Sequence, residues 1–239
     1  MPKRGALLEE PKVDTDRLVL DQALIEALTA RLAAGSDASP DASSPYASAL
    51  ALRALLDEAD DVHQAAMLRA LWGRIDARTG PAIVACGPAA QLLAADRFGL
   101  SVRTVADSDA ALAQAAAGAQ ALIDLGGTRP WWGKLLARPE LGVIAALPDD
   151  RDGQPRALMV AAAQTGPTGE DRTFWVTDAG LSDARLVRDL STCGFVARPL
   201  ASAGGLKLFM LAGYVQAEDG RLSAAPGALK GVIGAAPVF

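Results

Sequence analysis

The chain has 239 residues, of which 51% are hydrophobic and 21% charged, and its formal net charge is −5. This composition is ordinary for a globular protein and too apolar for a disordered one, and the length allows two or three small domains. The negative net charge and the lack of a basic run exclude the positively charged surface with which proteins bind nucleic acid. A single histidine and two distant cysteines, Cys86 and Cys193, exclude a convincing zinc site.

The sequence holds no apolar run of about 18 residues, so we expect no transmembrane helix and no membrane partner. Residues 1–5 are followed by Glu9 and Glu10 rather than by a long apolar segment, which is not the pattern of a secretory signal. A soluble cytoplasmic protein is therefore the expectation.

Helical spacing of leucine and alanine dominates the first third of the chain. A first helix is expected between Asp14 and Gly35, followed by a polar loop over residues 36–43. Ser44 can cap the next helix, with Pro45 in its first turn, where a missing amide proton costs nothing. Asp60 or Asp61 is expected to cap a third helix, which ends near residue 80.

From residue 82 onward short apolar runs alternate with helical segments. This alternation predicts an α/β layer with mostly parallel strands, because each crossover helix returns the chain to the same end of the sheet. The predicted strands are 82–85, 102–105, 121–125, 142–147 and 157–162, and the predicted helices are 90–98 and 107–117.

The segment from residue 172 to the end has a β-α-β-β-α-β rhythm, which is a ferredoxin-like pattern. We expect a strand at 173–176, a helix at 182–192 and a hairpin of 196–200 with 206–214. A short helix and a last strand at 232–238 would complete the unit.

The stretch from Gly127 to Lys134 is the strongest candidate for a binding site. A Gly-Gly turn after a strand, with Thr128 as a cap, presents backbone amides that suit a carboxylate or phosphate. Arg129 would add positive charge, and the tandem indoles of Trp131 and Trp132 could cover an aromatic ring. Alternatively, the two indoles pack one part of the fold against its neighbours.

Residues 13–80 resemble the all-helical class of chorismate mutase, in which a proline, here Pro45, opens the second helix. The positions where that family carries its acid, arginine and glutamate are Ser48, Ala51 and Leu52. The resemblance therefore implies a divergent mutase that is weak or inactive. It leaves Arg17, Arg31 and Arg53 as possible replacement cations, of which we take Arg31 and Arg53 as the catalytic candidates. The mutase reaction needs no cofactor.

Residues 81–170 resemble the start of prephenate dehydratase, through Gly87-Pro88, an alanine pair and Phe98-Gly99. The resemblance implies that Gly87 and Pro88 belong to a ligand site together with Gly127, Thr128, Arg129, Trp131 and Trp132. The length between residues 81 and 170 allows one lobe, not the two that surround the dehydratase site. Asp171-Arg172-Thr173-Phe174 is similar to that family's catalytic Thr-Arg-Phe, with two residues exchanged.

Residues 171–239 resemble the ACT regulatory domain. The expected fold is thus α+β and multidomain: a helical chorismate-mutase-like region (13–80), one α/β lobe (81–170) and an ACT-like βαββαβ domain (171–239). The order implies a place in phenylalanine and tyrosine biosynthesis, a small aromatic or dicarboxylate metabolite as ligand, and a homodimer. A non-catalytic small-molecule-sensing regulator and an interaction scaffold stay open as alternatives.

Overall fold

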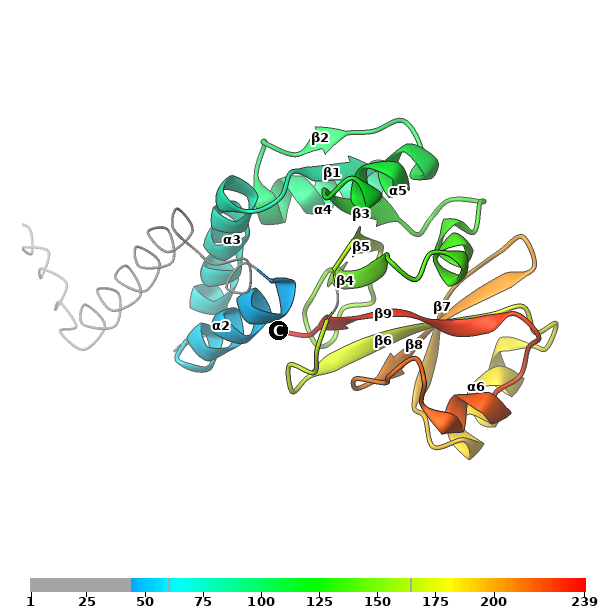
Figure 1. The fold of residues 1–239 in the computed structure, drawn as a ribbon. Helices are drawn as coiled ribbons and strands as arrows, with labels where there is room; N and C mark the ends of the chain where they lie inside the picture. The colour runs from blue at the N-terminus through cyan, green and yellow to red at the C-terminus, as the bar shows by residue number, and fades with distance from the viewer. Residues whose placement is uncertain (1–43, 60, 164) are drawn as a thin grey trace, which may run out of the picture. The chain divides into compact units, whose positions relative to one another are not determined.

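Nine strands join in one mixed sheet in a computed structural model that describes residues 44–59, 61–163 and 165–239 (Figure 1). All of these residues belong to one compact unit. The order across the sheet is β2-β1-β3-β5-β4-β9-β6-β8-β7. The strands are β1 Ile83–Cys86, β2 Arg103–Thr104, β3 Gln120–Asp124, β4 Gly142–Leu147, β5 Ala157–Ala161, β6 Asp171–Thr177, β7 Ala197–Ala203, β8 Leu206–Ala212 and β9 Lys230–Pro237.

Seven helices accompany these strands in the described ranges. They are α2 Pro45–Asp57, α3 Val62–Thr79, α4 Pro88–Phe98, α5 Ser108–Ala116 and α6 Asp183–Thr192, with the 3-10 helices η2 Trp131–Ala137 and η3 Gly220–Ala224. The predicted strands and helices between residues 82 and 192 are confirmed as elements. The helix expected between Asp14 and Gly35, and the loop over 36–43, lie outside the described residues.

The first half of the sheet begins with parallel pairing and then turns antiparallel. β1 pairs in parallel with β2 on one side and with β3 on the other, and helices α4 and α5 make the crossovers. β5 then pairs antiparallel with both β3 and β4. The expectation of mostly parallel strands therefore holds only for β1, β2 and β3.

The second half of the sheet is antiparallel and is continuous with the first. β6 pairs with β8 and β9, and β8 pairs with β7. β9 also pairs in parallel with β4 through Val143 and Gly234, so one strand serves both halves (Figure 1). A Cβ at Gly234 would overlap the backbone of Val143, which is why the two strands can approach only with glycine there.

This continuity overturns the expected fold class of a separate α/β lobe beside an ACT-like domain. The strand pattern of residues 171–239 indicated its elements correctly, but it could not show that the free edge of β9 pairs with β4. The domain boundaries at residues 80 and 170 stay a prediction.

Apolar side chains fill both faces of the sheet, as the period of two along each strand requires. One face is covered by α5 and η2, around Leu112 and Trp132. The opposite face is covered by α4 over the first half of the sheet, around Phe98, and by α6 and η3 over the second half, around Leu186 and Leu222.

Helices α2 and α3 have the local signals that the sequence predicts. The Ser44 side chain accepts a hydrogen bond from the amide of Ala47, and Asp61 caps α3 through the amides of His63 and Gln64. The caps at Ser44 and Asp61 are confirmed. The chorismate-mutase-like helical region is wrong as a fold assignment, because α2 and α3 are separate helices of 13 and 18 residues and α3 packs on α4 of the sheet layer.

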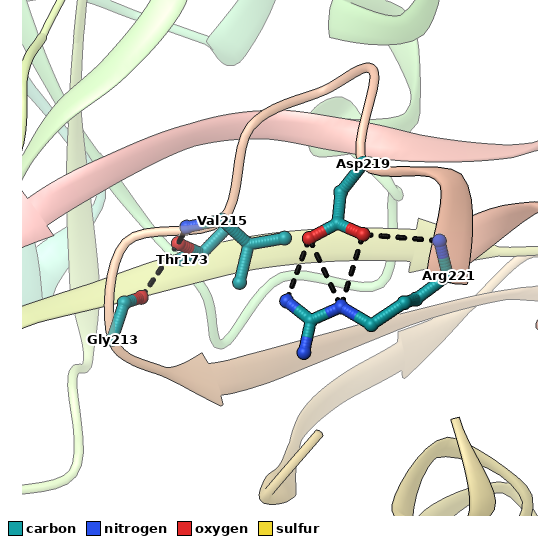
Figure 2. A network of polar contacts seen from close by, with 5 residues as sticks. All are labelled: Thr173, Gly213, Val215, Asp219 and Arg221. Atoms are coloured by element: carbon teal, nitrogen blue, oxygen red, sulfur yellow. Dashed lines mark hydrogen bonds and ion pairs between the residues drawn. The ribbon is translucent and has the colours of Figure 1, made fainter. Parts of the chain in front are cut away.

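The connection from β8 to η3 is fixed to β6 by a buried hydroxyl (Figure 2). Thr173, which is fully buried, donates to the carbonyl of Gly213 (2.8 Å) and accepts from the amide of Val215 (2.8 Å). Farther along, Asp219 accepts from the backbone and the guanidinium of Arg221. The hydrogen bonds from Arg221 hold the pKa of Asp219 below its ordinary value.

No helix within the described ranges is long and apolar enough to span a bilayer.

Candidate functional site

A cavity of about 200 Å³ lies where α3 and α4 meet the connection that follows β4. Its wall combines five apolar side chains with five ionisable ones, so a molecule bound there would contact both apolar surface and charged groups. The lining residues are Ala66, Arg69 and Ala70 of α3, Leu93, Asp96 and Arg97 of α4, and Leu147, Pro148, Asp149 and Asp150.

Two guanidinium groups share one carboxylate in this cavity. Arg97 Nη2 lies 3.1 Å from Asp149 Oδ2, and Arg69 Nη1 lies 3.8 Å from Asp149 Oδ1. The three side chains are 13%, 20% and 15% exposed for Arg97, Arg69 and Asp149. Because they are largely shielded from water, their mutual attraction is stronger than that of a surface ion pair.

The cluster leaves one buried donor without an acceptor. Among the described residues, Nη1 of Arg97 has no hydrogen-bond partner although the atom is buried. Burial lowers the pKa of Arg97, and the nearby carboxylate of Asp149 opposes that effect. The guanidinium stays charged at neutral pH. A buried charged donor without an acceptor is costly, and because Nη1 is buried it does not face the open space of the cavity.

The site depends on a close crossing of α3 and α4. A Cβ at Gly73, in the middle of α3, would overlap the backbone oxygen of Arg97. Arg97 itself lies in the last turn of α4, where the helix dipole favours a cation. Gly73 therefore allows the helix that carries Arg69 to approach the helix that carries Arg97.

Arg172 holds the loop that contributes Asp149. Its buried guanidinium donates to the carbonyl oxygens of Asp150, Arg151 (2.9 Å) and Gly153 (2.9 Å). Burial lowers the pKa of Arg172. The sequence resemblance associated Arg172 with a catalytic motif, whereas the structure places its side chain in contact with backbone carbonyls behind the cavity.

The predicted ligand residues Gly87 and Pro88 lie at the start of α4, beside the carboxylate of Asp124. Asp124 accepts hydrogen bonds from the amides of Ala89 (2.9 Å) and Gly126 (2.7 Å). The amides that suit an external anion are thus already bound to a carboxylate of this chain. The role of Gly87 and Pro88 in ligand binding stays a prediction.

The tandem indoles lie in the core rather than on the surface. Trp131 is 3% exposed and Trp132 is fully buried, and their rings meet edge to face at 6.0 Å. Trp131 donates to the backbone carbonyl of Asp124 (2.9 Å). Gly127, Thr128 and Arg129 form an exposed turn before η2, and their predicted ligand role, like that of the two indoles, is untested.

Arg53 joins α2 to the C-terminal strand region. Its Nη2 donates to the hydroxyl of Thr168 (3.1 Å) and to the carbonyls of Glu170 (3.0 Å) and Val238 (2.9 Å), and its guanidinium lies over the ring of Phe239. Arg31 lies outside the described residues. The catalytic role predicted for Arg31 and Arg53 stays untested.

Arg69, Arg97 and Asp149 are the residues that sequence reasoning missed. The charged run that follows the predicted strand at 142–147 was a usable signal, since polar loops after strands often carry function. Nothing in the spacing of Arg69 and Arg97 indicated that their helices cross.

Within the described ranges, no group of three or more His, Cys, Asp or Glu side chains could hold a metal ion. The predicted homodimer, and the predicted lack of nucleic-acid and membrane partners, stay predictions.

Comparisons with known proteins do not place the chain in a family. No family model and no curated protein matches it. A solved structure described as "GqqA- a novel type of quorum quenching acylases" aligns with a TM-score of 0.44 at 15% identity, over 66% of this chain and 95% of that chain. A likeness at that level carries no statement about the activity of this chain.

The comparisons overturn the assignment to the chorismate mutase family. No family model and no curated protein supports a mutase, dehydratase or ACT region, and the continuous nine-stranded sheet is not the expected arrangement of three such regions. The predicted function in aromatic amino-acid biosynthesis depended on that assignment, so this prediction was wrong too. The alternatives of a sensing regulator and an interaction scaffold have no support either.

Proposed function

We propose that this protein binds a small carboxylate-bearing molecule in the cavity between α3 and α4. The observation that carries the proposal is the pair of largely shielded guanidinium groups, of Arg69 and Arg97, that meet at Asp149 in the wall of the cavity. A carboxylate oxygen is the strongest common acceptor for a guanidinium, and charge-assisted bonds of this kind contribute about twice as much as neutral ones.

Two further features support a small ligand. The cavity volume of about 200 Å³ is below the range usual for drug-sized molecules, which is about 300–1,000 Å³. The walls from Leu93, Leu147 and Pro148 are apolar, so they suit a short hydrocarbon portion behind the carboxylate.

Calorimetric titration of the full chain with acetate, propionate, butyrate and pentanoate tests the proposal. We expect binding that strengthens with chain length and is lost in Arg97→Gln. The matched control is Arg103→Gln, which removes an exposed arginine of β2 and should leave binding unchanged.

Because Arg97→Gln also leaves Asp149 with one partner fewer, a second variant keeps the charges intact. Ala70→Leu fills the cavity from α3 and suits a helix, so it should fold and fail to bind. Binding that is equally strong in Arg97→Gln and Ala70→Leu, or absent in the wild-type protein up to millimolar ligand, would overturn the proposal.

A cytoplasmic location is proposed as well. Cys86 and Cys193, the two cysteines of the chain, are both free thiols, which suits a reducing compartment. Fractionation of cells that express the tagged chain tests this, and recovery outside the cytoplasmic fraction would contradict it.

A further inference from the structure

Polar side chains of α2 point toward the rest of the protein. Ser48 donates to Asp76 Oδ2 (3.0 Å) and accepts from the indole of Trp72 (2.9 Å). Arg53 donates to backbone carbonyls next to β6 and β9. A helix on the surface of a globular protein usually has the reverse arrangement, with its polar residues outward and its apolar residues inward.

The outward side of the pair formed by α2 and α3 is correspondingly apolar. On α2, Leu50 is 39% exposed, and Ala51 and Ala54 are exposed beside it. On α3, Met67 is 65% exposed and Leu71, one turn later, is 44% exposed. These five residues are the outer patch. Large apolar side chains that are exposed together mark a surface that contacts another molecule.

Charges of opposite sign flank the outer patch at its two ends. The two helices run antiparallel, since Ser48 near the start of α2 contacts Asp76 near the end of α3. Asp57, at the end of α2, is therefore at one end of the patch, and Arg74 and Arg78 are toward the other. All three side chains are exposed, and each lies two turns beyond a residue of the outer patch, on the same side of its helix.

This arrangement is complementary to itself. A two-fold axis perpendicular to the helices would place Asp57 of one copy beside Arg74 and Arg78 of the other, twice, with the apolar residues in contact between them. The face is about 27 Å long, the length of the 18-residue α3, and two helices wide, which suits a small dimer interface. A patch for a different protein needs no such internal balance of charge.

We propose that a second copy of this chain docks on the outer patch and forms a two-fold symmetric dimer. The small side chains of Ala51 and Ala54 let the facing helices approach closely, while Leu50, Met67 and Leu71 supply the apolar area. The proposal is independent of the binding function of the cavity, because the outer patch contains none of the residues that line it.

Sedimentation equilibrium of the full chain tests the proposal. The wild-type chain should be a dimer at micromolar concentration. Met67→Glu and Leu71→Glu should each raise the dissociation constant by at least about tenfold, because the symmetry places every new carboxylate in the interface twice. The matched control is Val196→Glu, at a position that is 72% exposed and directly precedes β7, and it should leave the dimer unchanged.

A charge exchange distinguishes the interface from a folding defect. Asp57→Lys alone, and Arg74→Glu combined with Arg78→Glu, should each weaken the dimer, because like charges then face each other across the axis. An equal mixture of these two variant proteins should form a heterodimer about as stable as the wild-type dimer, since both contacts regain opposite charges. Mixing does not repair a chain that fails to fold.

Three outcomes would overturn the proposal. If the wild-type chain is a monomer at every concentration, the outer patch is covered by a different protein or by residues outside the described ranges. If the dimer withstands Met67→Glu combined with Leu71→Glu, it is formed by another surface. If the mixture of charge variants stays monomeric while each variant is folded by circular dichroism, the two copies do not meet in the two-fold arrangement.

Discussion

The side-chain carboxylate of Asp124 accepts a hydrogen bond from the backbone amide of Ala89, in the first turn of α4. Asp124 lies at the end of β3, and α4 follows β1, so a residue 35 positions away caps this helix. Gly87, which precedes the helix, supplies no side-chain cap of its own. The Asp124 carboxylate therefore caps α4, as the side chain of a Ser or Asp at the N-cap position does in other helices.

Replacing Asp124 by alanine should destabilise the fold by about 1–2 kcal/mol, because it removes the cap of α4 and the acceptor for Gly126. Urea unfolding followed by circular dichroism measures the change. Asp152→Ala, at an exposed position with no such contact, is the matched control. Formate at high concentration should restore part of the stability of Asp124→Ala, and equal stability of the two variants would contradict this account.

Gly87→Ala should cost more than Gly118→Ala. Both glycines have positive φ, 92° and 95°, so alanine is strained by about 1–2 kcal/mol at either position. At Gly87 the new Cβ would also lie 2.6 Å from Cβ of Asp124, whereas Gly118 has open space. The difference between the two midpoints of thermal unfolding isolates the clash, and identical midpoints would exclude it.

Gly73→Ala tests the crossing of α3 and α4. Alanine in a helix interior usually stabilises by about 1 kcal/mol relative to glycine. We expect net destabilisation instead, because the Cβ would overlap the backbone oxygen of Arg97. Gly180→Ala, where nothing lies near the added atom, is the control. A gain in thermal stability for Gly73→Ala would show that the helices can separate at no cost.

Thr173→Val should destabilise the protein by about 1–3 kcal/mol. The substitution keeps the shape but leaves the carbonyl of Gly213 and the amide of Val215 without their hydroxyl partner in a buried place. Thr173→Ser retains both hydrogen bonds and should lose less. Chemical denaturation of the two variants provides the comparison, and the prediction fails if serine is the more damaging substitution.

The thiol of Cys86 should make stability fall at alkaline pH. Burial raises the pKa of Cys86, and the carboxylates of Asp107 and Asp124 raise it further. The unfolded chain then loses its thiol proton at a lower pH than the folded chain does, so stability is full below about pH 8.5 and declines above it. Between pH 7 and pH 10, wild-type protein should lose more unfolding free energy than Cys86→Ala.

The sequence allowed the elements to be predicted better than their assembly. The caps at Ser44 and Asp61, and the alternation from residue 82, depend on neighbours within a few positions, so local patterns reveal them. The pairing of β9 with β4 joins Gly234 to Val143, far along the chain, and no local pattern encodes that contact.

The candidate site was largely hidden for the same reason. Arg69, Arg97 and Asp149 come from three separate elements, and each alone reads as a solvated charge on a helix or loop. The tandem tryptophans, by contrast, could be recognised in the sequence. The residue types alone did not distinguish a ligand-binding surface from a place in the core. Burial of Trp132 required the contacts of the assembled sheet.

The position of β9 between β4 and β6 has a consequence for synthesis of the protein. Until residues 230–237 leave the ribosome, β4 and β6 each present an unpaired edge, and exposed edges recruit other chains. The pairing of β9 with β4 joins Val143 to Gly234, distant in the sequence, and such non-local contacts slow folding. A nascent chain stalled before β9 should therefore depend on chaperones and be captured by them, while the released chain should not.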